Sequence, residues 1–330
     1  MEITRDLHQI QVPLPDNPLG CVNVYAIRAD DGWTIVDTGF PTDEAYDSLT
    51  TQVRELAGDL ANLKTIIITH WHHDHFGLAM RLQAESGAQI VIHEVEVEFI
   101  NGLMANRLED RKRITDWLLL NGANSVGTAM LNPPPLKGNS ANGGAFRPDV
   151  TLRGGERLSI GKFNFDVIWT PGHSDGHICL HEPAERILIS GDHILPIITP
   201  AINYYARTKG NPLARFLNSL DLVKDLEVTT VLPAHEHIFH DLRGRVEQLQ
   251  IHHKERGEAI MEAMGNSAQS AWDISSQIPW AEGLWKWNEM PEMHKTLAIM
   301  ETLAHLFHLS FEDHVERISE DGLYKWKRLR

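Results

Sequence analysis

The sequence predicts a layered α/β fold followed by a helical carboxyl-terminal part, and three observations lead to this prediction. Short β-branched runs alternate with helical patterns through the first hundred residues, strand patterns return over residues 150–190, and helical periodicity follows Asp241. Strands that alternate with helices are typical of layered α/β domains. We therefore predict a first domain over residues 1–241 and a second domain over residues 242–330.

Length and composition are those of a folded globular protein. The chain has 330 residues, of which 42% are hydrophobic and 23% charged, and its formal net charge is −15. A strongly acidic chain is a poor bulk partner for nucleic acid or for an anionic membrane. Cys21 and Cys179 lie far apart and predict no disulfide framework. Because the amino terminus lacks a secretory pattern and no apolar run is long enough to span a bilayer, we expect a cytoplasmic protein.

Local patterns define the elements of the amino-terminal part. The β-branched run over residues 64–68 predicts a buried strand, and Thr42 before Asp43 and Glu44 predicts the start of a helix. The predicted strands are residues 3–12, 22–28, 33–39, 64–68 and 89–92, and the predicted helices are residues 42–57 and 76–84.

Four potential metal ligands directly follow the strand predicted at residues 64–68. They are His70, His72, Asp74 and His75. The carboxyl ends of strands are where α/β sheets place their ligands, and so polar a run would end a strand poorly if stability alone mattered. Imidazole and carboxylate groups suit zinc, and also iron or manganese. The segment is therefore predicted to be a metal-binding loop.

The order His70-x-His72-x-Asp74-His75 resembles the signature of the metallo-β-lactamase superfamily. The resemblance implies an αββα sandwich that holds two divalent metal ions, with zinc as the first expectation. His70 and His72 would hold one ion, and Asp74 and His75 the other. Asp74 would also help to orient the nucleophile. Further ligands are then expected later in the chain.

Three later residues match the remaining ligands of this superfamily. His173 matches the third histidine, Asp192 the bridging carboxylate and His235 the last histidine, and each follows a predicted strand. In the superfamily, the bridging carboxylate is the pattern of the thioesterase, lactonase and nuclease branches. The true β-lactamase branches lack it, so the resemblance disfavours antibiotic hydrolysis.

Two further residues are candidates for supporting the ligands. Asp37 ends the strand predicted at residues 33–39, where it is either a turn residue or a carboxylate that orients the ligand loop. The superfamily has an aspartate at a similar place, which favours the second interpretation. His237 is expected to support the ligands or to lie on the surface, because the ligand set is complete without it. The same applies to His73, His177 and His193.

Tyr205 is the candidate for a catalytic side chain outside the ligand set. It belongs to the pair Tyr204-Tyr205, between two of the ligand-bearing segments. One tyrosine of this pair could reach the metals and polarise a carbonyl. The alternative is ordinary packing of an aromatic pair.

Residues 94–148 interrupt the alternation of strands and helices. A helix is predicted over residues 103–120, and a Gly-, Pro- and Asn-rich stretch follows it over residues 121–148. Because long loops inside a compact domain are usually functional, we predict a helical insert and a flap over the metal site. The alternative is a solvated excursion with no role in substrate binding.

The later elements complete the predicted architecture. Strands are predicted at residues 150–152, 157–160, 163–169, 177–181 and 187–189, and helices at residues 213–226, 242–264, 271–278 and 297–307. Residues 314–327 read as a hairpin with an Asp-Gly turn. Helices followed by a hairpin resemble the winged-helix-like appendage of the superfamily branch that includes a β-lactamase-like endoribonuclease.

The predicted function is metal-dependent hydrolysis by a hydroxide that two metal ions activate, acting on a small ester, thioester or lactone. The net charge favours such a substrate, as do the apolar residues of the insert, which are Met104, Trp117 and residues 118–120. Two alternatives stay open. One is an endoribonuclease or phosphodiesterase, because a small basic patch surrounds Trp326 and comprises Lys325, Lys327, Arg328 and Arg330. The other is a non-catalytic, metal-binding regulatory protein. We expect the tail to pack on the site or on a second subunit of a homodimer.

Overall fold

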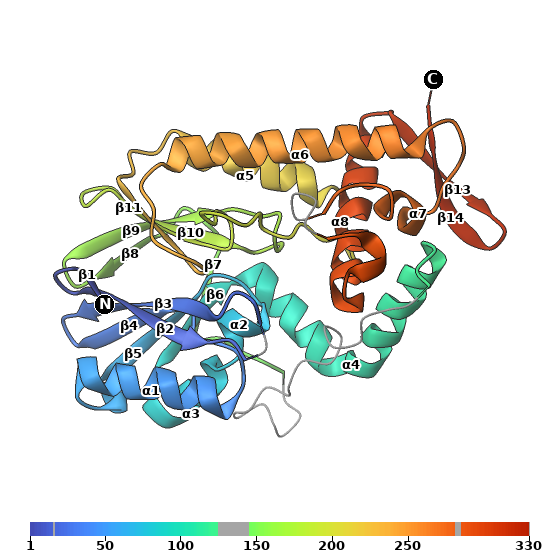
Figure 1. Cartoon of the computed structure of the whole chain (residues 1–330). Helices are drawn as coiled ribbons and strands as arrows, with labels where there is room; N and C mark the ends of the chain where they lie inside the picture. The colour runs from blue at the N-terminus through green and yellow to red at the C-terminus, as the bar shows by residue number, and fades with distance from the viewer. Residues whose placement is uncertain (16, 125–144, 281–284, 330) are drawn as a thin grey trace. The chain divides into compact units, whose positions relative to one another are not determined.

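The computed structural model of the chain describes residues 1–15, 17–124, 145–280 and 285–329 (Figure 1). The chain falls into two compact units. The first comprises Met1–Ala105, Pro134–Pro200 and Asp221–Arg245, and the second comprises Asn106–Pro133, Ala201–Leu220 and Val246–Arg330. Each unit is thus assembled from separate stretches of chain. The domain boundary predicted after residue 241 stays a prediction.

Among the described residues, the first sheet of unit 1 has seven strands, which lie in chain order. They are β1 (Glu2–Thr4), β2 (Leu7–Pro13), β3 (Cys21–Ala29), β4 (Gly32–Val36), β5 (Leu63–Ile68), β6 (Gln89–His93) and β7 (Val150–Leu152). Neighbours from β1 to β4 pair antiparallel, and those from β4 to β7 pair parallel. Because β4 and β5 are parallel, the segments that follow them leave the sheet at the same edge.

The second sheet of unit 1 has five strands in the part of the chain that the structure describes, in the order β12-β11-β10-β9-β8. They are β8 (Arg157–Ile160), β9 (Phe163–Trp169), β10 (Ile178–Glu182), β11 (Ile187–Gly191) and β12 (Thr230–Pro233). Only the pair β11 and β12 is parallel among these strands, with Gly191 opposite Pro233. The residues that follow these two strands, Asp192 and His235 among them, therefore start from one edge.

Side-chain alternation along the strands divides the core of unit 1 into two layers. Ile66 and Ile68 of β5 pack in one cluster with Leu49, which lies on helix α1 (Asp43–Ala57). Ile67, between them, packs in another cluster with Phe165 of the second sheet. Successive side chains of a strand point to opposite faces, so one face of the first sheet meets helices and the other meets the second sheet. This arrangement confirms the predicted α/β sandwich.

The helices of unit 1 agree with the sequence patterns except at two starting points. Thr42 caps α1 as predicted, with its Oγ1 accepting a hydrogen bond from the backbone N–H of Ala45. After β5, a one-turn helix α2 (His73–Phe76) precedes α3 (Ala79–Ser86). Helix α4 spans Glu94–Leu120 and so begins well before the predicted start at residue 103. Residues 125–144 of the predicted flap lie outside the described residues.

Unit 2 contains the carboxyl-terminal helices. Its main elements after residue 245 are the rest of α6 (Leu242–Met264), α7 (Ala271–Ser275), α8 (Glu292–Phe311), β13 (Val315–Glu320) and β14 (Leu323–Arg328). The two strands form an antiparallel hairpin whose turn residues, Asp321 and Gly322, both have positive φ. That conformation is the one an Asp-Gly hairpin turn requires. Helices followed by a hairpin are the predicted order, and the winged-helix assignment itself stays a prediction.

Within the described parts of the chain, none of the helices has both the length and the apolar character needed to cross a bilayer.

Candidate metal centre

The segment after β5 presents four of the predicted ligands in two different ways. His70 is fully buried at the end of the strand, and His72 precedes helix α2. Asp74 and His75 lie within α2 rather than on a loop as predicted. Because the helix begins at His73, His75 turns into the interior and the Asp74 side chain stays 23% exposed.

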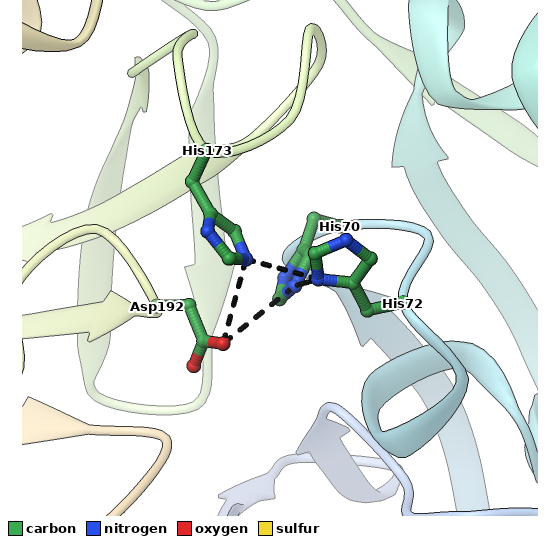
Figure 2. Close-up of side chains that lie close together, drawn as sticks. All are labelled: His70, His72, His173 and Asp192. Carbon is green, nitrogen blue, oxygen red and sulfur yellow. Dashed lines mark hydrogen bonds and ion pairs between the residues drawn. The ribbon is translucent and has the colours of Figure 1, made fainter. Parts of the chain in front are cut away.

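One group of side chains combines three imidazoles and a carboxylate from both sheets (Figure 2). Nδ1 of His72 lies 2.9 Å from Nε2 of His70 and 2.9 Å from Nε2 of His173. Oδ2 of Asp192 lies 3.5 Å from Nε2 of His173 and 3.9 Å from Nε2 of His70. Four potential ligand atoms thus face a common point.

A second group lies next to the first and also contacts Asp192. It consists of Asp74, His75 and His235. Nε2 of His235 lies 3.4 Å from Oδ2 of Asp74 and 3.4 Å from Oδ1 of Asp192. Oδ2 of Asp192 lies 3.5 Å from Nε2 of His75. Asp192 therefore contacts members of both groups. In the second group its Oδ1 faces His235 and its Oδ2 faces His75.

The hydrogen-bonding capacity of these side chains fits a bound cation. A ring nitrogen carries at most one proton, so Nδ1 of His72 cannot satisfy both of its imidazole neighbours. Nε2 of His75 and Oδ1 of Asp192 are buried and have no hydrogen-bond partner among the described residues. Buried polar atoms without partners are costly unless something binds them. Metal ions that accept these lone pairs would satisfy them.

Asp37 and Thr69 orient two of the imidazoles from behind. Asp37 accepts hydrogen bonds from Nδ1–H of His75 at 2.8 Å and from the Thr69 backbone N–H at 2.8 Å. The Thr69 hydroxyl donates to Asp37 at 2.8 Å, and Nδ1–H of His70 can then donate to that hydroxyl at 3.0 Å. Both rings are thereby held with Nε2 toward the centre. Asp37 does this from a left-handed backbone with φ 65°.

His235 is oriented by the amino-terminal strands. Its Nδ1–H donates to the carbonyl of Cys21 at 3.1 Å, so Nε2 faces the two carboxylates. The Tyr25 hydroxyl donates to the carbonyl of Pro233 at 2.6 Å, and Nδ2 of Asn23 donates to the same oxygen at 3.0 Å. Side chains of the first sheet therefore hold the end of β12 in place.

His177 holds the backbone of Asp192. It is fully buried, and its Nε2 accepts a hydrogen bond from the Asp192 backbone N–H at 3.1 Å. Its Nδ1 lies 2.8 Å from Oγ1 of Thr170. Gly191 has φ 52°, and a Cβ atom there would lie 2.6 Å from Nε2 of His177. Glycine before Asp192 is therefore required by both the backbone conformation and the space.

The charges in the centre favour ionised carboxylates. Burial raises the pKa of Asp192, but the charges of His235 and His75 outweigh this effect, so that the pKa lies well below its usual range. Burial lowers the pKa of His235, and Asp192 and Asp74 outweigh this and raise it to about 10. Burial and the neighbouring imidazoles lower the pKa of His70. Because protons and metal ions compete for the same lone pairs, this anionic surrounding also favours cations.

Tyr205 and His237, which the sequence also suggested, are not members of either group. Tyr205 belongs to unit 2, where its hydroxyl accepts a hydrogen bond from Nδ2 of Asn203 at 3.2 Å. Burial raises the pKa of Tyr205 to about 12, so the phenol is neutral at pH 7. His237 lies exposed on the loop after His235. The catalytic role of Tyr205 and the supporting role of His237 stay predictions.

Glu96 is a buried residue of this region that the sequence patterns did not single out. It lies in the first turns of α4, is 1% exposed and accepts a hydrogen bond from the backbone of Trp71. Burial raises its pKa to about 7, while its hydrogen bonds with Ser174, Gly176 and Trp71 act in the opposite direction. The sequence signal that could have identified Glu96 is its position just after a predicted strand. The helix predicted from residue 103 begins too late to include it.

The α/β sandwich, with imidazoles and carboxylates converging at its strand ends, defines a protein of the metallo-hydrolase class. A family model described as "Metallo-beta-lactamase superfamily" matches residues 18–235, and the chain belongs to this superfamily. The predicted family is thereby confirmed.

Several known proteins are similar to this chain. The crystal structure of the metallo-beta-lactamase family protein TTHA1429 from Thermus thermophilus superposes with a TM-score of 0.81 at 29% identity, covering 99% of this chain and 100% of the other. The probable metallo-hydrolase YqjP of Bacillus subtilis is 25% identical over 335 residues, or 99% of each protein. The human acyl-coenzyme A thioesterase MBLAC2 is 27% identical over 176 residues, which are 52% of this chain and 57% of that protein.

Proposed function

We propose that this chain is a hydrolase that uses two divalent metal ions to cleave a small ester, thioester or lactone. The observation that carries the proposal is the position of Asp192, whose carboxylate lies within 3.9 Å of imidazole nitrogens in both groups. One ion would be held by His70, His72 and His173, and the other by Asp74, His75 and His235, with Asp192 shared. Imidazole and carboxylate ligands favour zinc, with iron and manganese as alternatives.

The residues of the centre would divide the chemistry between them. Two bound divalent ions supply the Lewis acidity that brings the pKa of a water molecule into the neutral range and polarises a carbonyl. The Asp74 side chain is 23% exposed, whereas the other carboxylate of the centre, Asp192, is 10% exposed. Asp74 is therefore the carboxylate best placed to accept a hydrogen bond from an entering water molecule and to orient it.

Exposed apolar residues near the ligand-bearing segments support an acyl substrate. Ile197 is 65% exposed and Ile198 is 37% exposed, and they lie a few residues after Asp192. Oε2 of Glu236, the residue after His235, accepts hydrogen bonds from the backbone N–H groups of Ile197 at 2.9 Å and Ile198 at 3.3 Å. The guanidinium of Arg245 donates to the carbonyls of the same two residues at 2.8 Å. These contacts hold two exposed isoleucines next to both ligand segments, and the relationship to an acyl-coenzyme A thioesterase supports the same substrate class.

The phosphodiesterase alternative has weaker support from the basic tail. Nζ of Lys325 lies 2.6 Å from Oε2 of Glu320, and Nζ of Lys327 lies 3.2 Å from Oε1 of Glu316. These cations already have carboxylate neighbours on the same hairpin, which lowers their value as phosphate contacts.

The experiment that tests the proposal combines a substrate panel with one substitution. The purified protein is assayed for metal content and for hydrolysis of thioesters, esters, lactones, phosphodiesters and β-lactams. Asp192→Ala should weaken metal binding and reduce turnover of the best substrate by orders of magnitude. Asp166→Asn is the control, because Asp166 lies on β9 and pairs with the exposed Arg157. A wild-type protein that turns over only phosphodiesters, or that turns over thioesters without metal, contradicts the proposal.

A further inference from the structure

The carboxylate of Glu96 lies between the two loops that carry the first ligand group. Oε2 accepts a hydrogen bond from the backbone N–H of Trp71 at 3.1 Å. Oε1 accepts one from the hydroxyl of Ser174 at 2.6 Å and one from the backbone N–H of Gly176 at 2.6 Å. The side chain comes from α4, so a third segment of unit 1 joins the loop after β5 to the loop after β9.

Two of the three donors are the immediate neighbours of proposed ligands, and the third, Gly176, lies three residues after His173. Trp71 lies between His70 and His72, and Ser174 follows His173. Nδ1 of His72 and Nε2 of His173, which come from these two loops, lie 2.9 Å apart. We propose that Glu96 is a positioning residue that holds these two loops together and thereby sets the metal affinity of the group His70, His72 and His173. This inference rests on the proposed metal-binding function.

The packing around Glu96 leaves little freedom for either loop. A Cβ atom at Gly176 would lie 2.7 Å from Cγ of Glu96 and 3.0 Å from Nδ1 of His93. The His93 ring stacks on Trp169, with centroids 5.3 Å apart, and the Trp71 ring packs on Phe99 at 4.3 Å. Because close packing excludes alternative positions, the hydrogen bonds to Glu96 define one separation between the loops.

A carboxylate is the side-chain group that these donors require. All three partners donate, and an ionised carboxylate offers acceptor sites on both oxygens. Glutamine would keep the size and one acceptor oxygen but would turn an N–H₂ group toward at least one donor. Alanine would leave two backbone N–H groups and a hydroxyl without their partner. The two substitutions should therefore loosen the loops to different degrees.

The test measures metal affinity rather than turnover. Metal-free wild type, Glu96→Gln, Glu96→Ala and Ser174→Ala are titrated with Zn²⁺ against a competing chelator, and with Co²⁺ by absorption spectroscopy. Glu98→Gln is the matched control, because Glu98 lies on the same helix and is exposed. His72→Ala and His235→Ala identify which of the two binding steps belongs to which group. His72→Ala should abolish one of the two metal-binding steps. We expect Glu96→Ala to lower the metal affinity of that same step by roughly 10- to 100-fold. Glu96→Gln should weaken it less, and Glu98→Gln should leave both steps unchanged.

The possible outcomes separate this inference from the proposed function. If the wild type binds two ions and both Glu96 variants bind them as Glu98→Gln does, Glu96 is not a positioning residue. Equal weakening of both steps together with a lower Tm would also overturn the inference, because it indicates general destabilisation. If Glu96→Ala does not fold, Glu96→Gln and Ser174→Ala decide, since each changes fewer hydrogen bonds. A wild type that binds no transition metal contradicts the proposed function itself.

Discussion

The Nδ1–H group of His75 donates a hydrogen bond to Oδ2 of Asp37 across 2.8 Å, and both side chains are buried. This contact fixes the His75 ring with its Nε2 turned toward Asp192, and that nitrogen has no hydrogen-bond partner among the described residues. A carboxylate behind a histidine ligand fixes the ring and raises its basicity.

Asp37→Asn should weaken the metal ion held by Asp74, His75 and His235 by roughly 10- to 100-fold. Asparagine tolerates the left-handed backbone that Asp37 adopts at φ 65°, so the substitution removes the charge without adding backbone strain. Competition titration with Zn²⁺ measures the effect. Asp37→Ala should be worse, since it adds strain at this position. An unchanged affinity in Asp37→Asn would show that Asp37 is a turn residue.

Removing the metal should lower the stability of unit 1. Without cations, three imidazole nitrogens of the first group face one another and two buried atoms near them lack partners. We expect close to two transition-metal ions per chain, and treatment with a chelator should lower the Tm by several degrees. A ligand present at 100 times its Kd contributes about 2.7 kcal/mol. Elemental analysis and calorimetry measure both quantities. A Tm that does not respond to the chelator or to added Zn²⁺ would contradict the assignment.

The exposed isoleucines after Asp192 should contribute to the binding of long-chain acyl substrates more than to that of short-chain substrates. Ile197→Ser and Ile198→Ser together should raise the KM for long-chain acyl thioesters roughly five- to tenfold, because about 1 to 1.4 kcal/mol of apolar contact is lost. Short-chain thioesters should change little, and metal content should not change. Leu222→Ser is the control, because Leu222 is similarly exposed at 62% on α5 (Pro212–Lys224). Equal effects on short and long chains would indicate that the loop positions ligands instead.

Acid should destabilise unit 2 through a buried histidine pair. Nδ1 of His253 lies 3.3 Å from Nε2 of His305, and both side chains are less than 5% exposed. Burial, with the nearby positive charges, lowers the pKa of His253 to about 3 and that of His305 well below 6.5. Both folded-state pKa values lie below the unfolded value, so the unfolded chain binds protons first. Stability present above pH 6.5 is therefore lost as the pH falls toward 3.

Thermal unfolding of the metal-free protein between pH 7 and pH 4 measures this effect. His253→Gln should reduce the loss of Tm on acidification, because one buried imidazole no longer has to remain neutral. The wild type and His253→Gln are compared in their metal-free forms, so that the ligand histidines of unit 1 contribute equally to the pH dependence of the Tm in both proteins. Identical pH profiles for the wild type and His253→Gln would show that the pair does not control acid stability.

Much of unit 1 could be predicted because its signals are local. The β-branched run of β5 is buried on both faces, and Thr42 caps α1, so each element carries its own pattern. The ligand spacing follows that strand, and the structure brings the seven predicted side chains into two adjacent groups. Their role as metal ligands stays a prediction.

The parts that sequence patterns missed depend on contacts between distant segments. Residues 94–99 alternate charged and apolar side chains, and Gly102 follows shortly after, which obscures the helical start at Glu94. Glu96 matters through Ser174 and Gly176, which lie far along the chain. Likewise, Asp74 and His75 look like loop residues, because a one-turn helix has too few residues for a periodic pattern.

The hydrogen bond from Tyr25 to the carbonyl of Pro233 has a consequence for the timing of folding. These residues belong to different sheets and lie 208 positions apart, and His235 follows two residues after Pro233. Contacts between such distant segments form slowly, because the long loop between them must close first. A chain still being synthesised cannot present His235 to the second group until both sheets have met. Full metal uptake would then mark the completion of folding. A metal ion that meets the chain before that point would encounter an incomplete set of ligands.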